Sequence, residues 1–92
     1  MANEEWGLIP ERMRGGIMRY IDHGIEPGHF LTAVICNDLY EAAGRADGEN
    51  RRLLFEYTYF FYNYAPSGCY GSKEKFLKWV SHKGLSGQGS GK

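Results

Sequence analysis

The sequence predicts an all-α fold, a compact bundle of four helices that self-associates. Apolar residues recur at helical spacing in four stretches, and glycine, proline or capping residues separate these stretches. A length of 92 residues suits one domain near the lower size limit for independent folding, so self-association would add useful buried surface. We expect the helical domain to occupy residues 1–84 and a flexible Gly/Ser-rich tail to occupy residues 85–92.

The first helix is expected over residues 10–23. Pro10 suits a first helical turn, and Gly24 suits the position after the last turn. Gly15 and Gly16 interrupt the helix and lower its intrinsic helix propensity. Their presence predicts a close crossing with another helix, or the approach of a ligand to the backbone.

The second helix is expected over residues 28–43, with Gly44 as its stop. Most sides of this helix are apolar, which is typical of a central helix or of one at an interface. Asp38 falls in the middle of its main apolar face. An unpaired buried charge is very costly, so Asp38 should either be tied to a partner in the fold or accept a hydrogen bond from a ligand.

The third helix is expected over residues 48–64, capped by Asp47. Its first face is typical of a core, and holds Leu53, Leu54, Tyr57, Phe60, Phe61 and Tyr64. The fourth helix is expected over residues 73–83, with Ser72 as its cap and Gly84 at its end.

The third helix carries a second aromatic stripe, formed by Phe55, Tyr59 and Tyr62. A small domain has too few elements to cover both sides of one helix. The stripe should therefore be covered by another subunit, by the N-terminal segment around Trp6, or by a ligand.

Arg51 and Arg52 lie beside this stripe in the sequence. Guanidinium groups pair with phosphates, and aromatic rings stack on bases. The same side chains also suit a protein interface with a polar rim. For a small nucleotide-type anion, the predicted ligand-binding residues are Arg45, Asn50, Arg51, Arg52, Phe55, Tyr59 and Tyr62.

The charge balance argues against a protein that coats DNA or RNA. Eleven basic and eleven acidic side chains give a net charge of zero, whereas general nucleic-acid binding needs a large positive excess. Residues 1–46 hold four basic and seven acidic side chains, and residues 47–92 hold seven basic and four acidic ones. If the two halves stay apart in space, the surface is dipolar and suits head-to-tail association.

No catalytic set is recognisable, so we expect no enzyme activity and no cofactor. The three histidines, His23, His29 and His82, lack metal-ligand spacing relative to the cysteines. Cys69 lies in the loop "SGCYGS" near a helix start, where a thiol can be activated. With no companion histidine at a recognisable spacing, a half-buried loop cysteine is the preferred interpretation.

The cysteines, the apolar runs and the N-terminal sequence together predict the cellular compartment. Cys36 and Cys69 show no C-x-x-C spacing and are expected to be reduced, as in a cytoplasmic protein. No apolar run approaches the roughly 18 residues of a membrane span. The start "MANEEWGLIP" does not resemble a signal peptide.

Three segments together resemble a family of small phage- and prophage-encoded proteins of uncharacterised function. They are "IPERMRGGIMRYIDHGIEPGHFLTAVICNDL", "AAGRADGENRR" and "YNYAPSGCYGS", and the resemblance covers roughly residues 9–84. It implies a protein that acts in the cytoplasm of an infected bacterium. Such accessory proteins counteract host defence by sequestering a signalling nucleotide, here at a subunit junction, or by blocking a defence protein as an inhibitor or adaptor.

Overall fold

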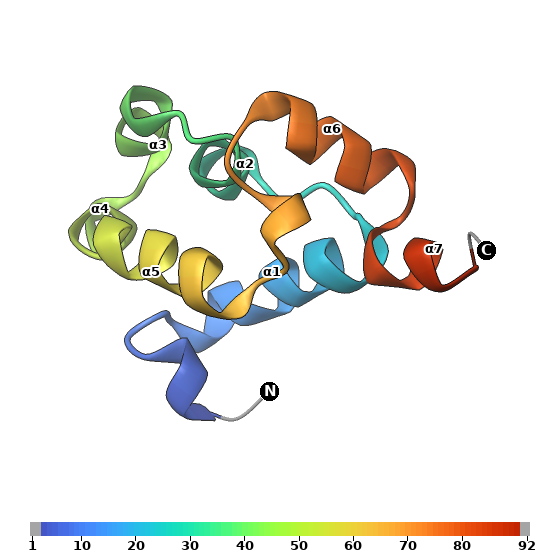
Figure 1. Ribbon diagram of the computed structural model, residues 1–92. Helices are drawn as coiled ribbons and strands as arrows, with labels where there is room; N and C mark the ends of the chain where they lie inside the picture. Colours follow the sequence, from blue (N-terminus) through green and yellow to red (C-terminus); the bar gives the residue numbers. More distant parts are fainter. Residues whose placement is uncertain (1–2, 91–92) are drawn as a thin grey trace.

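Helices are the only regular secondary structure in the described part of the chain (Figure 1). The computed structural model describes residues 3–90, with side chains for residues 5–87. Across that range there are seven α-helices, two short 3-10 helices and no strand. The predicted all-α class is confirmed, whereas the predicted bundle of four helices is not found.

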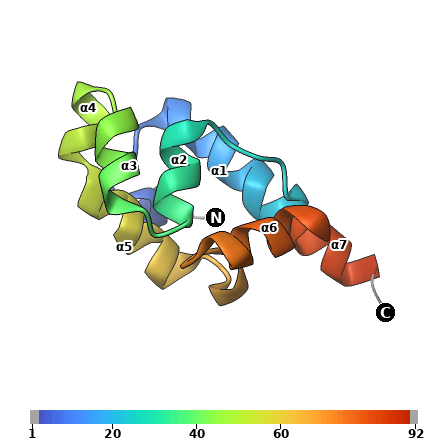
Figure 2. The ribbon, with the colours of Figure 1, turned by 90° about the horizontal axis from the view of Figure 1, so that it is seen from above.

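The elements follow one another with short connections. They are η1 (Asn3–Trp6), α1 (Glu11–His23), α2 (His29–Ile35), α3 (Leu39–Arg45), α4 (Gly48–Arg52), α5 (Leu54–Tyr64), η2 (Ser67–Cys69), α6 (Lys73–Ser81) and α7 (Gly84–Ser90). Seen from above, α2 lies at the centre, with α3, α5 and α6 packed around it (Figure 2). Five of its seven residues are buried, as its apolar sequence suggests.

The predicted second helix is in fact two helices, α2 and α3. The chain turns at Asn37, which adopts a left-handed φ of 64°. The N–H of Asn37 bonds to the carbonyl of Val34 at 3.1 Å, and the N–H of Asp38 bonds to that of Ala33 at 2.9 Å. This pair of bonds is a Schellman motif, and asparagine tolerates the left-handed conformation that it requires.

Asp38 begins α3 and does not lie in a buried helix face. Its carboxylate accepts a hydrogen bond from the N–H of Glu41 at 3.2 Å, so it is the N-cap of the new helix. Both Asp38 and Leu39 are exposed. The predicted buried position of Asp38 is therefore wrong, because a helix that restarts at residue 39 turns that face to solvent.

The predicted third helix is also interrupted, at Leu53. Asp47 caps α4 as predicted, accepting from the N–H of Asn50 at 2.8 Å. The N–H of Leu53 bonds to the carbonyl of Asn50 only three residues back, which tightens the last turn of α4. Ser72 caps α6 as predicted, through the N–H of Lys75 at 3.1 Å.

The core lies between α1, α2, α5 and α6. Tyr20 is fully buried, stacks on Phe76 with ring centroids 5.6 Å apart, and donates its hydroxyl proton to the carbonyl of Cys69 at 2.6 Å. The indole N–H of Trp79 is shared between the carbonyls of Tyr20 and Ile21 at 3.0 and 3.1 Å. These bonds give hydrogen-bond partners to carbonyl groups in the last turn of α1, which lie inside the core, where unpaired carbonyls would be costly.

Helix α7 begins at Gly84, the last residue of the predicted domain, and continues through residues 85–90 of the predicted tail. Residues 91–92 of that tail lie outside the described range. Helix α7 packs against α1 (Figure 1). The contact depends on Gly24 and Gly84, which have φ values of 69° and 66°. A methyl group on Gly84 would lie 2.6 Å from the amide nitrogen of Gly24, so the two backbones meet directly.

Gly15 and Gly16 do not form the predicted close helix crossing. Methyl groups at these positions would meet side-chain atoms of Arg19 and Leu31, at 3.1 Å or more. The close backbone approach of this fold is instead at the end of α1. Across residues 3–90, no helix is both long and apolar enough to cross a membrane.

Candidate functional site

Four rings of α5 lie in solvent, and we call Phe55, Tyr59, Tyr62 and Tyr64 the aromatic face. Phe55 and Tyr62 are each 75% exposed, Tyr59 is 51% exposed and Tyr64 is 40% exposed. The centroid of Tyr59 lies 6.4 Å from that of Phe55 and 6.5 Å from that of Tyr64. The second stripe of the predicted third helix lies outside the core, and Tyr64, predicted in the core, is exposed at the last turn of α5. A clustered set of exposed rings is typical of an interaction surface.

The N-terminal segment packs on the other side of α5. Trp6 stacks on the buried Phe60, with centroids 4.7 Å apart and planes 7° from parallel. The guanidinium of Arg14 lies 5.6 Å from the centre of the Trp6 ring, and its Nε donates to the carbonyl of Ile9 at 3.0 Å. Residues 5–9 therefore complete the core and leave the aromatic face uncovered.

Arg51 and Arg52 are exposed and form no ion pair within residues 5–87. They end α4, whereas the rings belong to α5, which begins at Leu54 after the turn. They lie next to the aromatic face along the chain, but no stacking of either arginine on Phe55 occurs in the described part. The arginines thus have charge available for a partner.

The other two predicted ligand-binding residues are engaged elsewhere in the fold. Asn50 is 4% exposed, and its amide oxygen accepts from the hydroxyl of Tyr57 at 2.6 Å. Arg45, on α3, donates from Nε to Glu41 at 2.6 Å. The structure therefore leaves the three predicted rings exposed on α5, with Phe55 and Tyr59 in contact, whereas Asn50 and Arg45 bond to other parts of the fold.

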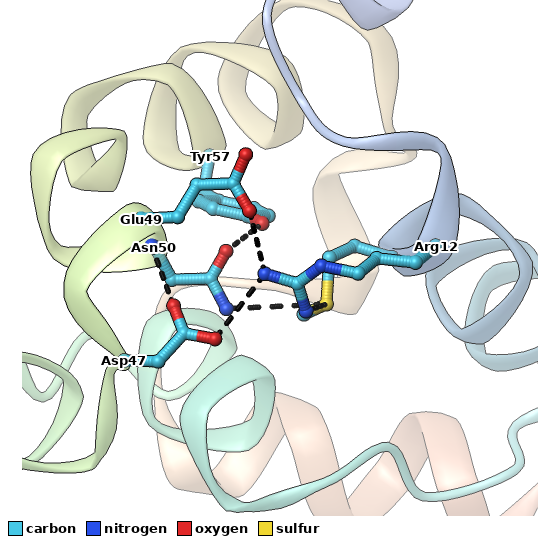
Figure 3. Close-up of polar contacts among 6 residues, drawn as sticks. Arg12, Asp47, Glu49, Asn50 and Tyr57 are labelled. Carbon is cyan, nitrogen blue, oxygen red and sulfur yellow. Dashed lines mark hydrogen bonds and ion pairs between the residues drawn. The ribbon is translucent and has the colours of Figure 1, made fainter.

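Asn50 belongs to a polar cluster that joins α1 to α4 and α5 (Figure 3). The guanidinium of Arg12 lies 2.7 Å from the carboxylate of Glu49 and 3.2 Å from that of Asp47. The hydrogen bond to Glu49 is the main cause that raises the pKa of Arg12, and the N–H of Asn50 is the main cause that lowers the pKa of Asp47. Burial raises the pKa of Tyr57 to about 12. The partners of these groups all lie within the fold, so we assign the cluster a structural role.

A groove of about 530 Å³ opens between α2 and α6, a second site that the sequence did not reveal. Its polar lining includes the acidic residues Glu26, Asp38 and Glu41 and the basic residue Lys73. Its apolar lining includes Phe76 and Leu77. Three of its acidic residues belong to the acidic first half of the chain, residues 1–46, whose charge excess by itself did not predict a groove. Sequence periodicity gave no sign of a hollow, because the walls come from segments about 40 residues apart.

The thiols are poor nucleophiles. Cys69 is fully buried, and burial raises its pKa to about 12, so the thiolate is absent at neutral pH. Burial is also the main cause that raises the pKa of Cys36, which lines the groove. Both cysteines are free.

No three His, Cys, Asp or Glu side chains of the described residues converge as a metal site.

Comparisons of the chain with family models, with curated proteins and with solved structures give no match. The functional interpretation therefore depends on the aromatic face and the groove themselves.

Proposed function

We propose that this protein is a non-catalytic binding protein that recognises another protein through its aromatic face. The observation that carries the proposal is the exposure of Phe55, Tyr59 and Tyr62, each more than half in solvent on one helix. Tyrosine and arginine are enriched at the energetic centres of protein interfaces. Here both kinds of side chain are exposed on adjacent helices, α4 and α5.

A protein partner suits the shape of this surface better than a small molecule does. Small ligands are usually enclosed by concave sites that bury most of their area. The groove of about 530 Å³ and a smaller hollow of about 50 Å³ are both lined by residues outside the aromatic face. In the cytoplasmic phage setting that the sequence resemblance implies, the partner would be a host defence protein.

Capture from a bacterial host lysate tests this function. Immobilised wild-type protein should retain one host protein in stoichiometric amount, and the double variant Phe55→Ser/Tyr62→Ser should lose it. Tyr40→Ser is the matched control, because Tyr40 is 89% exposed and belongs to α3 rather than to α5. Equal retention of the same protein by the face variant and the control would overturn the proposal.

A second candidate function is sequestration of a nucleotide at a subunit junction. The exposed Arg51 and Arg52, without ion pairs in the described part, favour it because they could hold phosphates while a ring stacks on the base. Ligand at 100 times its Kd would add about 2.7 kcal/mol of stability. A thermal-shift panel of cyclic and linear dinucleotides should then show a rise that Arg51→Gln/Arg52→Gln abolishes, and a flat panel excludes this candidate.

A further inference from the structure

The groove between α2 and α6 combines negative charge with apolar surface. Glu26, Asp38 and Glu41 contribute three carboxylates. Arg45 pairs with Glu41 at 2.6 Å, which leaves Glu26 and Asp38 against one ammonium group from Lys73. Phe76 and Leu77 supply apolar area on the α6 side. A complementary occupant would carry positive charge close to an aromatic or aliphatic group.

The chain itself displays such a surface. Arg51 and Arg52 are positive and exposed, and Phe55 follows them as the first ring of the aromatic face. None of these residues lines the groove, so one copy can offer both surfaces at the same time. The volume of about 530 Å³ falls in the range, roughly 300–1,000 Å³, of sites that enclose a bound group.

We propose that the groove is the docking site for the aromatic face of a second copy of this chain. The inference rests on the proposed function, because the second copy would occupy the same aromatic face and would compete with a host protein for it. The contact is heterologous: the face of each copy enters the groove of the next, and this arrangement closes as a ring or continues as a filament.

Charge complementarity favours this arrangement. The groove presents the exposed carboxylates of Glu26 and Asp38 to the arginines. Because these charges are exposed, the association should weaken as salt concentration rises.

A mixing experiment with two variants tests the inference. Phe55→Ser/Tyr59→Ser removes the face, and Glu26→Lys/Leu77→Lys alters the groove at two exposed positions. Glu11→Lys is the control for charge reversal, because Glu11 is exposed on α1 and lies outside the groove. Circular dichroism first confirms that each variant is folded.

Light scattering then gives the masses. Wild type and the Glu11→Lys control should form assemblies that grow with concentration, while the face and groove variants should each have the mass of one chain. An equimolar mixture of the two variants should form a complex of two chains and stop there, because only one face and one groove remain intact. Full assembly by the groove variant, or a monomeric wild type at every concentration, would overturn the inference, and the lysate capture decides the proposed function separately.

Discussion

The hydroxyl of Tyr57 donates a 2.6 Å hydrogen bond to the amide oxygen of Asn50, and both side chains are buried. The bond joins α4 to α5 across the turn at Leu53 (Figure 3). The amide nitrogen of Asn50 lies 3.9 Å from the sulfur of Met13, which extends the contact to α1.

Replacing Tyr57 with phenylalanine should destabilise the fold, because it leaves a buried acceptor on Asn50 without its donor. Such a loss costs about 1–3 kcal/mol. Urea unfolding at neutral pH measures it. Tyr62→Phe is the control, because its hydroxyl belongs to an exposed side chain and its loss should stay within about 0.5 kcal/mol. Equal unfolding free energies for the two variants would contradict the role given to the bond.

Stability should fall at alkaline pH. Burial raises the pKa of Tyr57 from 10.0, and that of Cys69 from 9.0, to about 12 in each case. Between pH 9.0 and about 12, the unfolded chain therefore binds fewer protons than the folded one. The contribution of these two groups to the unfolding free energy is therefore constant below pH 9.0 and decreases as pH rises through this window.

Urea midpoints measured from neutral pH to about pH 12 check this prediction. The double variant Cys36→Ala/Cys69→Ala should delay the onset of the decrease, because it removes both thiols with raised pKa values and leaves the buried tyrosines, which begin to lose protons in the unfolded chain only near pH 10.0. A midpoint that stays level across the whole range would be inconsistent with neutral, buried tyrosine and thiol groups.

Gly84→Ala should destabilise the junction between α1 and α7. The left-handed φ of 66° is strained for alanine, and the added methyl group would lie 2.6 Å from the nitrogen of Gly24. The strained φ alone costs about 1–3 kcal/mol. Gly44→Ala is a matched control inside α3, with no atom within 4 Å of the new methyl group, and should gain about 0.5–1 kcal/mol. Thermal unfolding should separate the two variants in opposite directions.

Asp38→Ala should weaken α3, because it removes the side-chain acceptor for the N–H of Glu41. Loss of an N-cap costs about 0.5–2 kcal/mol. Asp38→Asn keeps an acceptor oxygen and should retain most of the stability. If the asparagine and alanine variants unfold at the same urea concentration, the cap does not hold the start of α3.

Substitutions on the two sides of α5 should have different effects. Phe55→Ser and Tyr62→Ser should change the unfolding free energy by no more than about 0.5 kcal/mol, because both rings are 75% exposed. Trp6→Ala should cost about 3–5 kcal/mol, because Trp6 is buried and stacked on Phe60. Chemical unfolding at a protein concentration low enough to prevent self-association gives both values, and a large loss at Phe55 would mean that its ring supports the fold.

Local signals in the sequence determined the helical class and several helix ends. Asp47 and Ser72 act as caps and Gly24 ends α1 as predicted, because capping depends on residues within one turn of each other. The exposed stripe of α5 also followed from helical periodicity. The break at Asn37 was missed because the apolar pattern continues across it, although Asn-Asp is a favourable pair for ending one helix and starting the next.

Only the tertiary structure decided which surfaces are buried and which are open. It places Trp6 on Phe60, Tyr57 against Asn50, and the acidic segment around Glu26 across a groove from α6. These contacts join residues from different helices, and neither periodicity nor capping specifies how separate helices meet. A helix face becomes a core, a groove wall or a free surface only when the packing of its neighbours is complete.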